Sequence, residues 1–486
     1  MSNDVRALEP KAIWENFADL NAVPRPSKKE ERVIQFMVDF GNKLGLKTET
    51  DKVGNIIIKK PATEGMEDRQ TVILQSHVDM VHQKNNDTDF DFDKEGIKMI
   101  VDGDWVKADG TTLGADNGIG VSTIMGILAS SDIPHPALEA MFTVDEETGM
   151  TGAKELDPSF YEGTILLNLD TEDDDEISIG CAGGIDTNTT YEYEELYSIE
   201  GVSTYKIEIK GLKGGHSGMD INSGRANANK LMGRFLVEAV DNLMIHELNG
   251  GGLRNAIPRE SVSIISVLFE EIKEFEQYIK DAEKTYQEEY VPVEKSIEIA
   301  VTKIDTPPKM VAGHEKNAML SAINAVHNGV FKMSLKFDDL VETSSSLAQV
   351  IIKDGVFETK SLQRSSVETT KADIARTIRS VFYLLGADVE QSGDYPGWEP
   401  NPDSPILKTM RSMYKARFNE EPKVMACHAG LECGILGKHL PNVDMISFGP
   451  TIQHPHSPDE CVQISSVQKF WGFLLEVLKE TPKKVS

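Results

Sequence analysis

The hydrophobic and polar residues in the first part of the chain follow two alternating patterns. In some segments apolar residues recur at the spacing of one helix face, as Val33, Met37 and Phe40 do. Other segments are short continuous apolar runs, which are typical of strands buried in a parallel sheet. The predicted helices cover residues 11–20, 30–44 and 118–128, and the predicted strands cover residues 71–81, 140–144 and 164–169. Strands that alternate with helices predict an α/β domain with a mixed, mostly parallel sheet flanked by helices.

A different pattern begins near Gly184, where apolar and polar residues alternate in strands that keep one face in water. The strands predicted here cover residues 205–209, 262–267, 297–301, 347–357 and 361–367. The predicted helices cover residues 232–243, 269–290, 318–326 and 372–385. Strands and helices recur in two groups of similar size, so we expect this region to be a doubled α/β insert.

Residues 392–405 are rich in Pro, Gly and Asp, which predicts a linker. The α/β pattern then returns, with helices at 406–418 and 467–478 and strands at 423–426 and 444–448. We therefore predict that one domain is interrupted by another. Residues 1–184 and 399–486 would form the first domain, and residues 185–398 would form the inserted domain.

Composition excludes several classes of partner. The 486 residues carry a net charge of −29, which argues against binding to nucleic acid or to anionic membranes. No apolar stretch approaches the roughly 18 residues that a transmembrane helix needs. Residues 1–6 lack a signal-peptide pattern, and four scattered cysteines (Cys181, Cys427, Cys433 and Cys461) do not suggest a disulfide framework. We therefore expect a protein of the reducing cytoplasm.

Candidate chemistry lies where the predicted strands end. The run from Thr71 leads directly into His77 and Asp79, which are two positions apart and so share one face of a strand. Ligands of open α/β sheets bind at the carboxyl ends of the strands. A carboxylate beside an imidazole can orient the ring toward a metal ion, although a lone His-x-Asp pair is more often structural.

Asp116 lies in the glycine-rich segment Leu113-Gly114-Ala115-Asp116-Asn117-Gly118, between a predicted strand and a predicted helix. Taken alone, it could be a metal ligand or a helix N-cap. The spacing of the glycines is not that of a dinucleotide-binding loop.

Two further strands end in acids, and a third ends in histidines. The strand at 140–144 leads into Asp145-Glu146-Glu147, so that one glutamate could bind a metal ion while its neighbour meets an attacking water. The strand at 164–169 leads into Asp170, whereas residues 172–176 suggest a solvated charged turn. Near the C-terminus a strand leads into a loop with His454 and His456, and residue chemistry alone does not choose between them. Such mixed nitrogen and oxygen ligands predict a site for two zinc ions.

These segments resemble the dinuclear zinc peptidases that include glutamate carboxypeptidase, peptidase T and the carnosinases, and most of all the branch that cleaves Xaa-His dipeptides. The resemblance covers essentially the whole chain. Its motifs are His77-Val78-Asp79, Gly114-Ala115-Asp116-Asn117-Gly118, Asp145-Glu146-Glu147-Thr148-Gly149, Asn168-Leu169-Asp170, Lys213-Gly214-Gly215-His216-Ser217-Gly218 and His456-Ser457-Pro458-Asp459-Glu460.

The resemblance implies a role for each residue of the centre. Asp116 would bridge two Zn²⁺ ions, although Mn²⁺ or Co²⁺ suits the same ligands. His77 and Asp170 would complete one metal site, and Glu147 and His456 the other. Further roles are implied for three residues: Asp79 orients His77, Glu146 is the general base, and His216 in the inserted domain stabilises the oxyanion.

Three more residues would bind a dipeptide substrate. Arg364 would bind its carboxylate, Asn255 its backbone atoms and Glu432 its free α-amine. The segment around Glu432, Cys427-His428-Ala429-Gly430-Leu431-Glu432-Cys433, departs from the loop of the carboxypeptidase relatives and favours a dipeptidase.

The sequence thus predicts a cytoplasmic, metal-dependent dipeptidase for Xaa-His substrates such as β-Ala-His. The alternatives are a tripeptide aminopeptidase or an N-acyl amino acid deacylase with the same fold and metals, and a non-catalytic peptide binder. The inserted domain resembles a lid and dimerisation domain, so a homodimer and a monomer are both open, because a doubled insert could replace the partner.

Overall fold

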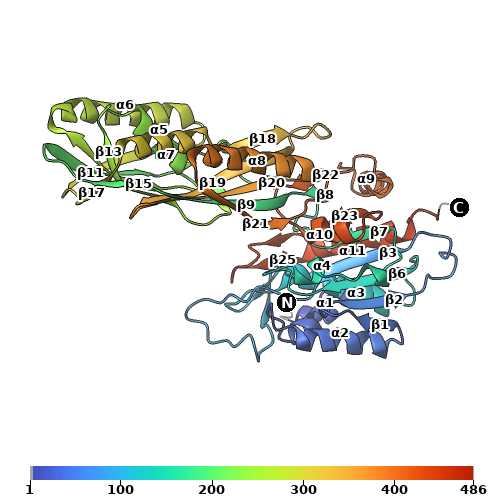
Figure 1. The fold of residues 1–486 in the computed structure, drawn as a ribbon. Helices are drawn as coiled ribbons and strands as arrows, with labels where there is room; N and C mark the ends of the chain where they lie inside the picture. Colours follow the sequence, from blue (N-terminus) through green and yellow to red (C-terminus); the bar gives the residue numbers. More distant parts are fainter. Residues whose placement is uncertain (1–3, 485–486) are drawn as a thin grey trace. The chain divides into compact units, whose positions relative to one another are not determined.

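The computed structural model describes residues 4–484, which divide into two compact units (Figure 1). The first unit contains the described residues up to 180, residues 400–426 and those from 431 onward. The second contains residues 181–399 and 427–430. Cys181 and Trp398 exchange two backbone hydrogen bonds of 2.9 Å, so the two ends of the long inserted segment lie side by side.

The first unit is built on an eight-stranded mixed sheet. In spatial order its strands are β1 (Lys47–Thr50), β2 (Ile56–Lys60), β6 (Leu138–Thr143), β3 (Val72–His77), β7 (Ile165–Asn168), β23 (Asp444–Ser447), β8 (Glu176–Cys181) and β22 (Lys423–Cys427). The four central strands β6, β3, β7 and β23 are parallel, and β6, β3 and β7 are buried along their whole length. The predicted fold class, a mostly parallel sheet flanked by helices, is confirmed.

Helices and a small sheet complete the first unit. The helices are α1 (Lys11–Asn21), α2 (Glu31–Lys43), α3 (Ala115–Ala129), α4 (Thr151–Lys154), α9 (Pro405–Phe418), α10 (Glu432–His439) and α11 (Ile464–Lys479), with short 3-10 turns η1 (Val5–Ala7) and η2 (Pro158–Phe160). A four-stranded sheet has the order β24 (Ile452–Gln453), β25 (Cys461–Gln463), β5 (Trp105–Ala108) and β4 (Met99–Asp102).

One apolar cluster supports the start of α3. Phe17 and Trp14 of α1 pack with Leu113 and Ile119, together with Val462 of β25. Burial of such side chains contributes about 1.5–3 kcal/mol each. This packing therefore restricts the movement of the segment that carries Asp116.

The second unit is an antiparallel sheet covered by helices. Its main strands, in order, are β16 (Glu298–Ile304), β11 (Val202–Lys210), β15 (Ser261–Leu268), β13 (Met244–Gly251), β19 (Val341–Lys353), β20 (Val356–Ser365), β9 (Gly183–Glu192) and β21 (Asp388–Tyr395), and β18 (Gly329–Met333) pairs with β19. The helices are α5 (Ala228–Glu238), α6 (Ile272–Tyr290), α7 (Gly313–Ala325) and α8 (Glu368–Leu385), and η3 (Phe269–Glu271) precedes α6. Two short pairs are β10 (Glu195–Tyr197) with β17 (Lys309–Val311), and β12 (Gly215–His216) with β14 (Ala256–Ile257).

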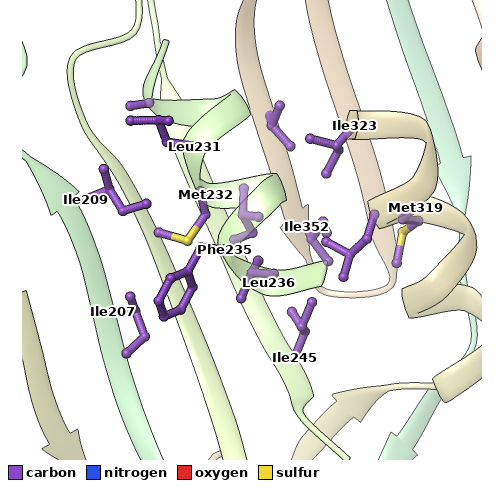
Figure 2. Close-up of a cluster of buried hydrophobic side chains, with 14 of the residues drawn as sticks. Ile207, Ile209, Leu231, Met232, Phe235, Leu236, Ile245, Met319, Ile323 and Ile352 are labelled. Atoms are coloured by element: carbon purple, nitrogen blue, oxygen red, sulfur yellow. The ribbon is translucent and has the colours of Figure 1, made fainter. Parts of the chain in front are cut away.

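A continuous apolar core joins the sheet of the second unit to its helices. Figure 2 shows Ile207 of β11 and Ile245 of β13 facing Phe235 of α5, with Met319 of α7 and Ile352 of β19 in the same cluster. Strands from both halves of the predicted doubled insert therefore belong to one continuous sheet, and the duplication itself stays a prediction.

Two boundaries and the surroundings of one turn differ from the sequence predictions. The predicted strand 347–357 spans a tight turn at Asp354-Gly355, which separates β19 from β20. The predicted linker 392–405 begins inside β21, which continues to Tyr395. The turn at 172–176 is not simply solvated: Asp174 forms an ion pair with Lys469 at 2.6 Å, and Asp175 forms one with Lys423 at 2.8 Å.

Among residues 4–484, none of the helices combines the length and the apolar character needed to cross a lipid bilayer.

Candidate metal centre

Neighbouring parallel strands bring the first group of predicted ligands together. His77 is the last residue of β3, and Asp170 follows the end of β7. The Nε2 atom of His77 lies 3.1 Å from Oδ1 of Asp116 and 3.5 Å from Oδ1 of Asp170. His77 is only 1 % exposed, so these contacts lie beneath the surface.

A second group of predicted ligands shares Asp116 with the first. The Nε2 atom of His456 lies 3.2 Å from Oδ2 of Asp116 and 3.0 Å from Oε2 of Glu147. The two carboxylate oxygens of Asp116 therefore face two different histidines. Ligand atoms of His77, Asp116 and Asp170 lie within 4.8 Å of one another, and so do those of Asp116, Glu147 and His456.

Of the two histidines that the sequence left open, the structure brings His456 to the acids. His454 is exposed and lines a shallow cavity of about 510 Å³ with Trp105, Lys107 and Asp459. Both histidines have a positive φ, 54° for His454 and 61° for His456.

Unpartnered acid atoms indicate that this cluster is suited to cations. Oε1 of Glu147 and Oδ1 of Asp170 are buried and have no hydrogen-bond partner in the described structure. An unpaired buried carboxylate oxygen is costly unless a proton or a cation compensates it. Two imidazoles with three carboxylates form the mixed nitrogen and oxygen ligand set that divalent metals such as zinc accept. The residues therefore fit a pair of metal ions.

The pKa values show how strongly the acids and histidines interact. Burial alone would raise the pKa of Asp116, but hydrogen bonds with His456 and His77 outweigh it and hold this pKa below its ordinary value. Hydrogen bonds to Asp116 and Glu147 raise the pKa of His456 to about 11. Burial raises the pKa of Asp170 to about 6. The acids and histidines therefore interact strongly when a proton lies between them, and a metal ion would supply positive charge at the same place.

Asp79 connects the end of β3 to the turn that carries the glutamates. Its carboxylate accepts the backbone N–H of Glu146 at 3.1 Å and of Glu147 at 3.3 Å, and the hydroxyl of Ser27 at 2.8 Å. Its Oδ1 atom lies 3.4 Å from Nδ1 of His77. This geometry suits the predicted role of Asp79, because a carboxylate at Nδ1 leaves Nε2 free to bind a metal ion.

The turn after β6 is held by a carboxylate that the sequence analysis did not single out. Asp145, at a φ of 56°, accepts a hydrogen bond of 2.5 Å from Lys28 Nζ. The hydroxyls of Thr148 and Thr151 donate to the same carboxylate. Glu146 therefore projects from a braced turn, and burial together with nearby acids raises its pKa well above the ordinary value.

Glu432 begins α10 and lies near the ends of β3 and β6. One carboxylate oxygen accepts hydrogen bonds from Gln75 Nε2 at 2.7 Å and from Thr143 Oγ1 at 2.8 Å. The other oxygen, Oε1, is buried and has no partner in the described structure. Burial raises the pKa of Glu432 to about 7. A buried acid with one open oxygen can receive an ammonium group, as the sequence analysis predicts for a substrate amine.

The remaining predicted substrate residues lie together in the second unit. Nδ1 of His216 accepts the backbone N–H of Met219 at 3.0 Å, so the neutral ring carries its proton on Nε2. Burial and the charge of Arg364 lower the pKa of His216, which favours this neutral donor. Arg364 NH2 lies 3.5 Å from the same Nε2, and the Asn255 carbonyl accepts the N–H of Ser217 at 2.8 Å.

Two further residues of this second-unit cluster were not found from the sequence. Tyr395 Oη accepts a hydrogen bond from Arg364 NH1 at 3.0 Å, and Nε2 of His428 lies 2.7 Å from the hydroxyl of Ser344. Burial and the positive Arg364 lower the pKa of His428 to about 3. No local sequence pattern around His428 predicts that its side chain is buried.

Comparison with known proteins identifies a peptidase family and several similar peptidases. Residues 73–480 match the peptidase family M20/M25/M40. The chain is 40 % identical to the cytosol non-specific dipeptidase of Escherichia coli strain K12, over 99 % of this chain and 100 % of that protein. The crystal structure of an aminoacylhistidine dipeptidase from Vibrio alginolyticus superposes with a TM-score of 0.95 at 41 % identity and covers 99 % of both chains. The aminopeptidase PepT from Bacillus cereus shares the fold, with a TM-score of 0.57 at 15 % identity over 98 % of this chain and 99 % of that one.

Proposed function

The chain belongs to peptidase family M20/M25/M40 and is a peptide hydrolase, and we propose that it is a dipeptidase that cleaves Xaa-His dipeptides at a centre for two divalent metal ions. One observation carries the metal part of this proposal. The two oxygens of Asp116 face two different histidines at 3.1 and 3.2 Å, each within its own group of acids. A shared carboxylate of this kind can bridge two metal ions.

The substrate part of the proposal is supported by the relatives. Two full-length relatives at 40 and 41 % identity are named as dipeptidases, and the name of one specifies aminoacyl-histidine. Within the described residues, Glu432 offers a buried open oxygen for a free amine, which a dipeptide carries and an N-acyl amino acid lacks. We therefore favour dipeptides over N-acyl substrates.

We propose which residues would bind each of the two metal ions. His77 and Asp170 would hold one metal ion, and Glu147 and His456 the other, with Asp116 between them. We propose Zn²⁺, although Mn²⁺ and Co²⁺ accept the same ligand types. When bound, the metal ions would polarise the substrate carbonyl and acidify the attacking water.

The chain's own residues would move the protons. Glu146 would accept a proton from the attacking water on its carboxylate and deliver it to the nitrogen of the leaving histidine. Burial raises the pKa of Glu146 above its ordinary value, which favours its accepting a proton. Asp79 would keep His77 oriented through Nδ1. His216 would donate its Nε2 proton in a hydrogen bond to the oxyanion, and Arg364 and Asn255 would bind the substrate. The lid and dimerisation roles of the second unit stay predictions.

A substrate panel with defined metal content tests the proposal. Protein stripped by a chelator should lose hydrolysis of β-Ala-His and Gly-His, and two equivalents of Zn²⁺, Mn²⁺ or Co²⁺ should restore it. Faster hydrolysis of tripeptides or N-acyl amino acids would identify another activity of the family. A bound dipeptide that survives incubation with the metal-loaded protein would instead indicate a binding protein.

A further inference from the structure

The backbone segment that carries Asp116 is held on one side by a buried carboxylate. Glu460 is 2 % exposed, and its two oxygens accept four consecutive backbone N–H groups. The distances are 2.7 Å from Leu113, 2.9 Å from Gly114, 2.7 Å from Ala115 and 3.2 Å from Asp116. Because four consecutive backbone N–H groups donate to the two oxygens of one buried side chain, Glu460 constrains the conformation of this segment.

A buried guanidinium holds the same segment through its carbonyl groups. Arg25 is 1 % exposed, and its NH2 donates to the carbonyl of Gly114 at 2.6 Å. Its NH1 donates to the carbonyls of Val78 and Asp79, both at 3.1 Å. Arg25 therefore joins the Asp116 segment to the residues that follow His77.

The backbone has space for this guanidinium only because Gly114 lacks a side chain. A Cβ atom at Gly114 would lie 2.5 Å from NH2 of Arg25, and the φ of 69° is one that glycine adopts without strain. Burial lowers the pKa of Arg25 to about 10, and nearby acids including Glu460 limit this decrease. Arg25 is therefore charged at neutral pH.

We infer that Arg25 and Glu460 are positioning residues, each of which sets the spacing of a different half of the metal centre. Arg25 fixes the distance between His77 and Asp116, because it binds the backbone beside both. Glu460 fixes the distance between Asp116 and His456, because it lies four positions after His456 and binds the Asp116 segment. This inference rests on the proposed two-metal centre.

Metal titration of the stripped protein tests the inference without any substrate. Zn²⁺ binding is measured by calorimetry against a competing chelator for wild type, Arg25→Lys and Glu460→Gln. His77→Ala and His456→Ala identify which binding step belongs to which half of the centre. We expect Arg25→Lys to weaken the His77 step and Glu460→Gln the His456 step, each by about 10–100-fold, which is the range for residues that orient metal ligands.

Glu139→Gln is a matched control. Glu139 is 4 % exposed and also accepts backbone N–H groups, from Glu162 at 3.0 Å and Gly163 at 2.9 Å. Glu139 is near the beginning of β6, whereas the proposed metal centre lies at the carboxyl end of that strand. We expect Glu139→Gln to lower the unfolding temperature of the stripped protein and to leave both zinc affinities unchanged. Glu460→Asp, which keeps the charge, should recover part of the lost affinity.

The possible outcomes separate the two proposals. If wild type binds two zinc ions and both Arg25→Lys and Glu460→Gln bind them equally well, the inference is wrong and the proposed function stands. The inference is also wrong if Glu139→Gln weakens zinc as much as Glu460→Gln does. If wild type itself does not bind two ions, the proposed two-metal centre is wrong. Should Arg25→Lys fail to fold, Glu460→Gln and Glu460→Asp decide the question alone.

Discussion

The imidazole of His77 and the carboxylate of Asp116 approach within 3.1 Å, although 39 positions separate them in the chain. Asp116 lies just as close to His456, which is 340 positions further on. One acid thus joins the end of a central strand to a loop near the C-terminus.

Replacing His456 should remove one metal ion, whereas replacing its neighbour His454 should not. His456 contacts Asp116 and Glu147, but His454 is exposed on the same loop. We expect His456→Ala to bind one zinc ion instead of two and to lose at least about 100-fold in kcat/KM, because a ligand of the reacting site is lost. Elemental analysis and kinetics with β-Ala-His measure both effects. Two bound ions in His456→Ala, or one in His454→Ala, would contradict the assignment.

Glu146→Gln should separate proton transfer from metal binding. The substitution keeps the shape of the side chain but removes the base, so kcat should fall by about 10²–10⁴-fold. The zinc content should stay at two, because Glu146 is not among the proposed ligands. KM should change little. Unchanged turnover by Glu146→Gln at full metal loading would show that another group accepts the proton. Asp459→Asn, an exposed acid on the His456 loop, serves as the control.

Glu432→Gln should weaken recognition of the substrate's free amine. Its Oε1 atom is buried without a partner, and an amide in its place presents no full negative charge to an ammonium group. We expect KM for Gly-His to rise about tenfold, which corresponds to about 1.4 kcal/mol, with a smaller change in kcat. Initial rates over a range of Gly-His concentrations measure this. An equal KM in wild type and Glu432→Gln would remove Glu432 from the binding site.

The buried His428 should make the second unit less stable in acid. Its pKa is about 3 in the folded chain and about 6.5 in an unfolded chain. Between these values the unfolded chain binds more protons, so stability falls as the pH falls. Relative to His428→Gln, wild type should lose about 2 kcal/mol between pH 7 and pH 5.

Urea unfolding at both pH values, followed by circular dichroism, measures this loss. His314→Gln is the matched control, because His314 lies on α7 of the same unit with its side chain 75 % exposed. If wild type and His428→Gln lose the same stability on acidification, His428 is not buried in its neutral form.

The sequence predicts the residues of the metal centre better than the groups that hold them. His77, Glu147 and Asp170 each follow a recognisable apolar run, and this local signal is enough to place them at strand ends. Arg25 and Glu460 bind backbone atoms far away in the chain; Arg25 and Gly114, for example, are 89 positions apart. Glu460 is part of the motif that begins at His456, but no side-chain pattern reports these backbone contacts, so the sequence alone does not predict what either residue binds.

In the inserted segment, too, contacts between distant residues cannot be predicted from local sequence patterns. Its alternating strands were found, but their neighbours are set by contacts between distant residues: β13 pairs with β19, and β20 pairs with β9. The periodic pattern therefore predicts strands and helices but not how the strands join into one continuous sheet. The turn at Asp354-Gly355 was missed because apolar residues continue on both sides of it.

The adjoining ends of the inserted segment have an evolutionary consequence. Because Cys181 and Trp398 are hydrogen-bonded neighbours, a segment of more than two hundred residues begins and ends at adjacent points of the structure. A host protein can gain, lose or exchange such a cassette by one recombination event and keep its own strand order. Substrate range can then diversify through the cassette while the ancestral hydrolytic chemistry is inherited intact.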